Sequence, residues 1–447
     1  MITRRQILGA SGLASLGGVL GGLGSSGQAA GDDYRALVVV YLNGGNDGNN
    51  LLVPTDAAYG DYASGRQNLA LAHNSLATLP GSSIGHTFGL HPALAPLVPL
   101  YAQGRLALIS NVGPLIEPAT ARQVLDGAVD VPPFLLSHSD QVAIVQGWMV
   151  QDDLSGWAGR ALELLPSNLR HALAAVTMDT NRTLVLGRHS PVSFMPAGGA
   201  SWWGMADLKQ PQTFGAQSLA RMAQWQFANA YEAEYARTFG LALSDQTSLT
   251  QAFLKAKAPA ADFGSDSLGK DLSSMASVLP IFKSDGLKRQ VFLRHWGGFD
   301  THTGQTGSDP KSQDTQFAVL AKALAAFDAT NKANGLDANV VTLVMSEFGR
   351  TLRPGSGGGS EHAWGSHWFA FGGPVAGGSV LGKFPTLTLG GPDDGDRNKN
   401  GRWVPTTSCD QVAASLTQWL GLPANLLHEV YPNLTNFSQK TIALLRA

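Results

Sequence analysis

A continuous run of apolar and largely β-branched residues at 36–42 is the feature that most narrows the possible folds of this chain. A strand that is apolar on both sides belongs to a parallel sheet with helices on both faces, since a solvent-facing side would carry alternating polar residues. The run stops at Asn43-Gly44-Gly45, which is typical of a turn. Further apolar runs that predict strands occupy residues 106–110, 183–186, 290–295, 340–345 and 368–371.

Segments with helical periodicity lie between these runs. Strands that alternate with helices predict an α/β fold with a mostly parallel sheet and helices on both faces. The ligand site of such a fold is expected outside the carboxyl ends of the strands. Residues 217–280 are nearly all helical in pattern, which predicts a helical insertion within one domain of residues 31–447. The predicted helices cover residues 93–103, 140–146, 217–239, 245–255, 267–279, 315–333 and 410–420.

The N-terminal residues 1–30 have the pattern of an export signal. Thr3-Arg4-Arg5 begins a charged start, and an uncharged stretch rich in Gly, Ala, Ser and Leu follows up to Ala29 and Ala30, where cleavage is expected. The start resembles the twin-arginine signal of bacteria, which predicts the twin-arginine translocase as a partner and a periplasmic or secreted protein. The middle of the segment is too rich in glycine for a membrane span, so no stable membrane insertion is expected.

Composition excludes several kinds of partner and site. The 31 Lys and Arg residues nearly balance the 33 Asp and Glu residues, which leaves no basic footprint for a nucleic acid. Cys409 is the one cysteine of the chain, so neither an intramolecular disulfide nor a cysteine-based zinc site can form. Any metal must therefore be bound by oxygen and imidazole ligands.

Polar residues of unusual type follow three of the predicted strands. After the first strand, a turn that contains Asn43 and Asp47 can present oxygens to a ligand or serve as an Asx turn. After the strand at 290–295, Asp300 and His302 stand two positions apart, so an extended backbone places both on one side. A carboxylate with an imidazole is a half-site for Zn²⁺ or Mn²⁺, and it is also a common structural pair.

The strand at 340–345 is followed by Glu347. A buried glutamate is costly unless it is paired or binds a metal. Arg350 is either the structural partner of this glutamate or a ligand for an anionic substrate.

Histidines gather in one C-terminal stretch of the chain, on both sides of a glycine-rich loop at 355–360. Clustering of His, Asp and Glu is what a metal site requires. Four of the 11 histidines belong to this stretch: His295, His302, His362 and His367.

Ser137 is the candidate nucleophile. It stands at the start of a predicted helix, where backbone N–H groups and the helix dipole favour an anion. A serine in this position can equally be a simple helix cap.

Several motifs in combination resemble one bacterial family. They are the twin-arginine start, Leu42-Asn-Gly-Gly-Asn-Asp-Gly48, Gly298-Phe-Asp-Thr-His302, Ser346-Glu-Phe-Gly-Arg-Thr351, Glu361-His-Ala-Trp-Gly365 and Pro405-Thr-Thr-Ser408. The family is the domain of unknown function DUF1501, which is similar in fold to the alkaline phosphatase superfamily that includes the sulfatases.

This resemblance implies a two-metal site at the strand ends and a small anionic ester as the substrate. The metals are expected to be Zn or Mn, with Ca or Mg also possible, and Ser137 would attack phosphorus or sulfur. The chain departs from the superfamily pattern at Asn43, where Asp is usual, and at Glu347-Phe348, where Asp-His is usual. The implied metal ligands are Asn43 or Asp47, Asp300 with His302, Glu347, and His362 or His367.

Two functions from different classes therefore stand side by side. Acids and imidazoles at strand ends behind an export signal predict an exported metal-dependent hydrolase of phosphate or sulfate esters. The departures at Asn43 and Phe348 instead favour a catalytically silent exported protein that binds an envelope glycan or a partner protein.

Overall fold

The computed structural model describes residues 33–147, 153–199, 202–203 and 206–446. The predicted export signal at residues 1–30 lies outside these residues. In the part of the chain that is described, no helix is both long enough and apolar enough to cross a membrane.

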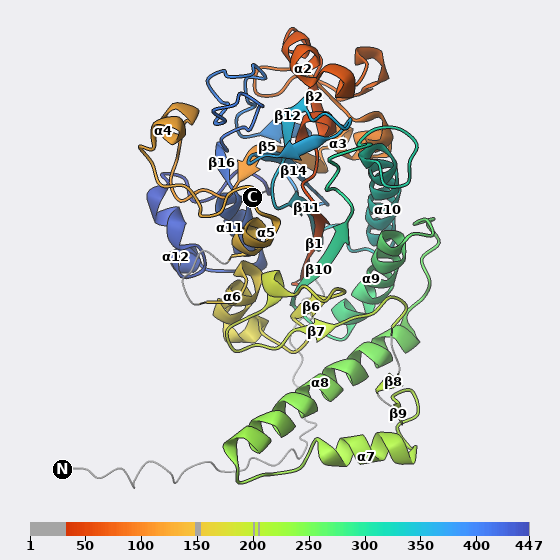
Figure 1. The fold of residues 1–447 in the computed structure, drawn as a ribbon. Coiled ribbons are helices and arrows are strands. Elements are labelled where there is room, and N and C mark those ends of the chain that lie inside the picture. Colours follow the sequence, from red (N-terminus) through yellow and green to blue (C-terminus); the bar gives the residue numbers. More distant parts are fainter. Residues whose placement is uncertain (1–32, 148–152, 200–201, 204–205, 447) are drawn as a thin grey trace, which may run out of the picture.

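A nine-stranded sheet forms the centre of the molecule (Figure 1). β1 (Arg35–Asn43) lies in the middle, parallel to β10 (Arg289–Gly297) on one side and to β11 (Val340–Ser346) on the other. All pairings in the sheet are parallel except those of β14 (Ser366–Phe371), which runs antiparallel to β11 and to β5 (Leu106–Gly113). The predicted α/β fold with a mostly parallel sheet is confirmed.

The remaining strands of this sheet are short. They are β6 (Ala175–Thr177), β7 (Ser193–Phe194), β15 (Ser379–Leu381) and β16 (Thr407–Ser408). The order is β15-β5-β14-β11-β1-β10-β6-β7, with β16 beside β5. Smaller sheets are formed by β2 (Leu52–Pro54), β3 (Ala77–Thr78) and β4 (Phe88–Leu90), by β8 (Trp202–Trp203) and β9 (Ala206–Asp207), and by β12 (Arg350–Pro354) and β13 (Ser360–His362).

Helices cover both faces of the central sheet, and β1 shows why they must. Its residues from Ala36 to Leu42 alternate between two hydrophobic cores, and each of them is at most 1% exposed. One core includes α6 (Trp157–Leu164) and α11 (Cys409–Leu420), and the other includes α9 (Ser267–Ser284) and α10 (Gln313–Ala333). The other helices are α1 (Gly48–Leu51), α2 (Tyr59–Arg66), α3 (Val98–Ala102), α4 (Ala121–Asp126), α5 (His138–Val145), α7 (Phe214–Met222), α8 (Ala230–Lys255) and α12 (Leu427–Val430).

Three predicted elements are wrong. The separate helix predicted at 245–255 is the second half of α8, which runs without a break through residues 240–244. Thr183–Val185 form a 3-10 helix instead of a strand, because Leu184 and Val185 already reach the core without pairing to the sheet. The single helix predicted at 217–239 is interrupted between α7 and α8. Asn229 begins the second helix, since its side-chain oxygen accepts hydrogen bonds from the backbone N–H groups of Tyr231 (2.9 Å) and Glu232 (3.3 Å).

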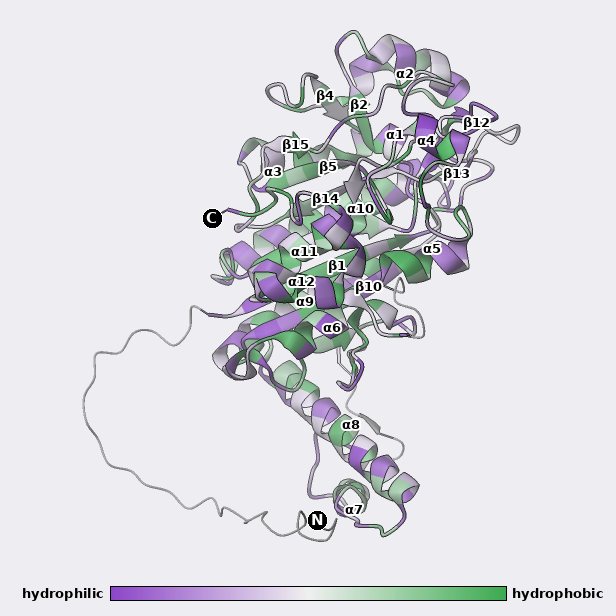
Figure 2. Ribbon diagram, turned by 90° about the vertical axis from the view of Figure 1, so that its left-hand side faces the viewer, coloured by the Kyte–Doolittle hydropathy of each residue, from purple (hydrophilic) through white to green (hydrophobic). Residues whose placement is uncertain are grey.

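The stretch predicted as a helical insertion divides into two parts. α7 and the outer part of α8 project away from the body as an arm, as Figures 1 and 2 show from two sides. In contrast, α9 lies against the sheet, with Leu272, Met275 and Leu279 fully buried.

We expect the central strands to carry much of the stability. Leu343 on β11 is 1% exposed, so Leu343→Ala leaves a cavity and should lower the free energy of unfolding by about 2–5 kcal/mol. Leu254→Ala is the matched control, because Leu254 on α8 is 53% exposed and its loss should cost less than about 0.5 kcal/mol. Urea denaturation measures both, and equal costs would contradict the assignment of the core.

Candidate metal centre

The carboxyl ends of β1, β10 and β11 meet at one rim of the sheet, and the segments that follow them carry the candidate residues. The β12–β13 pair forms directly after β11, with Arg350 opposite His362. The start of α5 reaches the same place, because the backbone carbonyl of Leu136 lies 2.7 Å from Nδ1 of His362. Three distant parts of the chain therefore share this rim.

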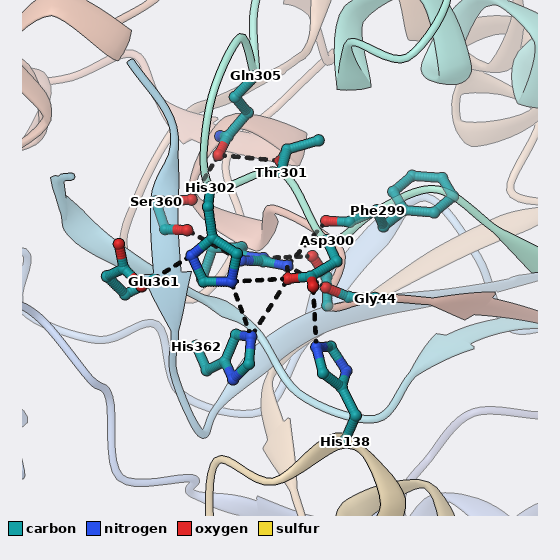
Figure 3. Close-up of polar contacts among 12 residues, drawn as sticks. Gly44, His138, Phe299, Asp300, Thr301, His302, Gln305, Ser360, Glu361 and His362 are labelled. Carbon is teal, nitrogen blue, oxygen red and sulfur yellow. Dashed lines mark hydrogen bonds and ion pairs between the residues drawn. The ribbon is translucent and has the colours of Figure 1, made fainter. Parts of the chain in front are cut away.

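Four side chains converge at the rim (Figure 3). Nε2 of His138 lies 3.3 Å from Oδ2 of Asp300. The Nε2 atoms of His302 and His362 lie 3.0 and 3.2 Å from Oδ1 of the same carboxylate. Among the described residues, His138, Asp300 and His362 form a group whose ligand atoms all lie within 4.8 Å of one another.

Each of the three imidazoles is held through its other ring nitrogen. Nδ1 of His362 faces the Leu136 carbonyl, Nδ1 of His302 lies 2.8 Å from Glu361, and Nδ1 of His138 lies 2.9 Å from Glu347. Carbonyl and carboxylate oxygens only accept hydrogen bonds, so each Nδ1 carries a proton. In the neutral ring this leaves the Nε2 lone pair directed at Asp300, as in histidines that bind metals.

These separations fit a tetrahedral divalent cation. Ligand atoms about 2.1 Å from a zinc ion lie about 3.4 Å from one another, close to the 3.0 and 3.2 Å from Oδ1 of Asp300 to Nε2 of His302 and of His362. The Nε2 atoms of His302 and His362 are 3.1 Å apart. Two lone pairs at this distance repel unless a proton or a cation lies between them. The donor set therefore fits a metal of the Zn or Mn type.

Arg350 fixes the position of Asp300. Its guanidinium is 0% exposed and donates to the Asp300 carboxylate at 2.5 Å. Burial raises the pKa of Asp300, but Arg350, His138 and His302 outweigh it and lower the pKa to about 2, so the carboxylate is ionised at neutral pH. Arg350 pairs with Asp300 and not with Glu347, and its burial makes it a positioning residue. Its other acceptors are the carbonyls of Gly44, Gly45, Phe299 and Ser360.

The turn after β1 approaches the site so closely that only glycine fits. Gly44 has a φ of +116°, and a Cβ there would lie 2.2 Å from the backbone nitrogen of Asp300. Phe348 packs beneath the site, with its ring centroid 4.8 Å from that of His138 and 4.7 Å from that of His362. Phe348 therefore supports two of the imidazoles by packing against their rings.

Glu347, a predicted metal ligand, contacts the imidazole of His138 and does not belong to the group of ligand atoms around Asp300. It is 1% exposed, and its Oε1 accepts hydrogen bonds from Nδ1 of His138 and from the backbone N–H of Gly44 (2.7 Å). The hydroxyl of Ser346 donates to Oε2 at 3.1 Å. The hydrogen bond that His138 donates to Glu347 raises the pKa of His138, while partial burial opposes the rise.

Asn43 and Asp47, the other predicted ligands of the first turn, make their side-chain contacts elsewhere, although Oδ1 of Asp47 is buried without a hydrogen-bond partner among the described residues. Oδ1 of Asn43 lies 3.0 Å from Nδ1 of His295. Asp47 forms a buried ion pair with Arg66 and also accepts a hydrogen bond from Gln305 at 2.6 Å. Neither side chain belongs to the convergent group.

His367 also lies apart from this group. Its Nδ1 accepts a hydrogen bond from the backbone N–H of Asn111 at 3.1 Å, and its ring stacks on Phe384. Complete burial lowers the pKa of His367 to about 3, so the imidazole is neutral. Its contacts are those of a core residue.

Ser137, the predicted nucleophile, lies next to the cluster in the chain. Its hydroxyl donates to Oδ2 of Asp140 at 2.5 Å. The preceding Leu136 has a left-handed φ of +73°, a strained conformation for leucine that directs its carbonyl to His362. His138 is the site residue that the sequence analysis missed, and its position beside Ser137 is the only local signal that could have indicated it.

A family model described as "Protein of unknown function (DUF1501)" matches residues 34–394. No curated protein matches the chain.

Several solved structures are remotely similar. Ps i-CgsB in complex with k-i-k-neocarrahexaose is 10% identical, with 88% of this chain and 74% of that chain covered and a TM-score of 0.35. The PsFucS1 sulfatase from Pseudoalteromonas sp. is 10% identical, with 85% and 72% covered and a TM-score of 0.31. The phosphonate monoester hydrolase SpPMH from Silicibacter pomeroyi is 9% identical, with 87% and 74% covered and a TM-score of 0.29. The residue roles given above rest on the geometry of this chain alone.

Replacing Arg350 tests whether its guanidinium holds the rim together. Arg350→Gln leaves several buried carbonyls without donors and should lower the free energy of unfolding by about 2–4 kcal/mol, as measured by urea denaturation. Arg122→Gln, at a site that is 85% exposed, should change it by less than about 0.5 kcal/mol. If Arg350→Gln were as stable as the control, the guanidinium would not hold the rim together.

Proposed function

The chain belongs to the DUF1501 family, and we propose that it is an exported, metal-dependent hydrolase of phosphate or sulfate esters. The observation that carries the proposal is the convergence of three imidazole Nε2 atoms on the single carboxylate of Asp300. A bound divalent cation would favour an anionic substrate, because its direct ligands, neutral imidazoles and one carboxylate, do not neutralise its charge.

The exposure of the cluster supports a catalytic site over a structural one. A structural metal site is closed by its protein ligands, whereas a catalytic site keeps one side open. The side chains of Asp300 and His302 are 45% and 40% exposed, so a small ester can approach from solvent. Phe348 is 1% exposed and closes the opposite side.

Asp300, His302 and His362 would bind the cation, with His138 as a further ligand. When bound, a Zn²⁺ or Mn²⁺ ion supplies a Lewis acid that stabilises negative charge on an ester oxygen. Ca²⁺ and Mg²⁺ prefer oxygen donors, so this mostly imidazole set favours Zn²⁺ or Mn²⁺.

The surrounding residues keep the ligands in their productive orientation. Glu361, Glu347 and the Leu136 carbonyl each accept a hydrogen bond from the protonated Nδ1 of one imidazole. The three rings cannot rotate without losing these hydrogen bonds. Arg350 holds the carboxylate from below. The donors are therefore organised before a substrate arrives.

We assign the nucleophile to Ser137. Asp140 accepts the hydrogen bond of its hydroxyl and is able to take its proton. Attack by Oγ would form a bond to phosphorus or sulfur and break the ester bond, with the Ser137 proton passing to Asp140 and the leaving oxygen taking a proton from solvent water. Water would then hydrolyse the covalent ester of Ser137 and restore the hydroxyl.

A second candidate function is a catalytically silent exported protein that binds an envelope glycan or a partner protein. It is favoured by the contacts of Asn43, which is bonded to His295, and of Phe348, which packs on imidazoles. Both positions would be metal ligands in a two-metal enzyme. A protein that binds metal but does not hydrolyse aryl phosphates, phosphodiesters or aryl sulfates would support this alternative.

Metal analysis tests the leading proposal directly. Protein purified without chelator should contain about one transition-metal ion per chain, and Asp300→Asn and His302→Ala should remove it. Glu361→Gln should weaken binding by roughly 10–100-fold, because Glu361 orients His302. His428→Ala is the control, since His428 is 59% exposed and contacts only Glu429 among ionisable groups. Full metal content in Asp300→Asn, measured by mass spectrometry, would refute the site.

The role of Ser137 can be separated from metal binding. Ser137→Ala should keep the metal content of the wild type and lower kcat on any ester that the wild type hydrolyses by at least about 10³-fold. Ser284→Ala is the control and should keep the activity, because the Ser284 hydroxyl lies at the end of α9 and donates to the Ile281 carbonyl at 2.9 Å. Unchanged turnover in Ser137→Ala would show that water, and not this hydroxyl, is the nucleophile.

A further inference from the structure

The α7–α8 arm extends from the end of the body that lies away from the metal centre (Figures 1 and 2). The metal centre belongs to the carboxyl rim of β1, whereas the arm leaves the body beside β7 at the edge of the sheet. The chemistry proposed for the metal centre therefore does not explain the surface of the arm.

Small residues form the inner surface of the arm. Of the residues in α7 and in the outer part of α8, Ala216 and Ala236 are buried. At Gly240 the two helices come so close that a Cβ would lie 3.2 Å from the carbonyl oxygen of Ala223. The helix pair is therefore closely packed at these small residues.

Large apolar side chains point outward on the same arm. An arm that worked alone in water would place such residues between its helices, so this arrangement is inverted. Trp225 and Phe227 also contact each other edge to face, with centroids 6.2 Å apart. The exposed fractions are 80% for Phe214, 40% for Met222, 56% for Trp225, 38% for Phe227, 89% for Tyr231 and 74% for Tyr235.

The charges of the arm argue against a membrane or a nucleic acid as its partner. Between residues 210 and 244 the charged residues are two arginines and two glutamates. One of each is already paired, since Arg237 donates to Glu234 at 2.6 and 2.8 Å. Helices that lie on anionic membranes carry many Lys and Arg residues, which this arm lacks.

We propose that the arm docks against the arm of a second copy of this chain. A neutral apolar surface is compatible with itself, and two helical hairpins related by a two-fold axis form a closed four-helix bundle. The six large side chains expose on the order of 700 Å² per copy. This is close to the roughly 800 Å² per partner of a standard interface.

Solution mass tests the proposal. The wild type should be a dimer at about 100 μM, a concentration above the Kd expected for such an interface, by light scattering after gel filtration. The double variant Tyr231→Glu/Tyr235→Glu should weaken dimerisation at least tenfold while keeping the metal content of the wild type. Phe134→Glu is the control, because Phe134 is an apolar residue of the body that is 72% exposed, and it should remain a dimer. A monomeric wild type would overturn the proposal, as would a double variant that stays dimeric.

Cross-linking gives a second and independent measurement. Cys409 is the native cysteine and is buried, so a cysteine introduced on the arm is the accessible thiol of the folded chain. Oxidised Tyr231→Cys or Tyr235→Cys should form a disulfide-linked dimer, whereas Phe134→Cys should not. Absence of the linked dimer in both arm variants, with both thiols labelled by a maleimide, would overturn the proposal. Flotation of a monomeric wild type with phosphatidylcholine vesicles would likewise overturn it.

Discussion

The buried guanidinium of Arg350 joins three segments that follow different strands of the sheet. It donates to carbonyls in the turn after β1, to a carbonyl and a carboxylate after β10, and to the carbonyl of Ser360 at the start of β13. Backbone hydrogen bonds add to these contacts, since the N–H of Ser360 donates to the Thr301 carbonyl at 3.1 Å and the N–H of Phe299 donates to the Asn43 carbonyl at 3.1 Å. The relative positions of the three segments, and hence the position of Asp300, also depend on one fully buried cation whose donors are all engaged.

The hydrogen bonds around this centre determine its chemistry. Glu361, Glu347 and a carbonyl set the tautomers of His302, His138 and His362, so three acceptor nitrogens face one carboxylate. Burial lowers the pKa of His295 to about 4, so this ring is neutral and pairs with the amide of Asn43 instead of carrying charge. The rim thus holds one compact group of ligands, and the neighbouring polar residues form a hydrogen-bonded support for it.

Much of the rim could be predicted from sequence because parallel strands end at the same edge of a sheet. That rule alone placed Asp300 and His302 near Glu347. The same rule could not predict which side chains form hydrogen bonds or ion pairs with one another inside the fold. Asp47 is bonded to Arg66, and His367 accepts a hydrogen bond from Asn111, 256 residues away. His138 was missed for the same reason, since only the tertiary path of the chain brings α5 to the rim.

The residues that form and support the candidate metal site are far apart in the sequence. His138 and Glu347 are 209 residues apart, and Leu136 and His362 are 226 residues apart. Bringing such distant segments together costs conformational entropy that grows with the logarithm of their separation. An ion bound between them would act as a reversible cross-link that the unfolded chain does not possess, and its binding free energy would add to that of folding. Metal binding and folding would then be coupled. The free concentration of the ion would help to set how long the native state persists.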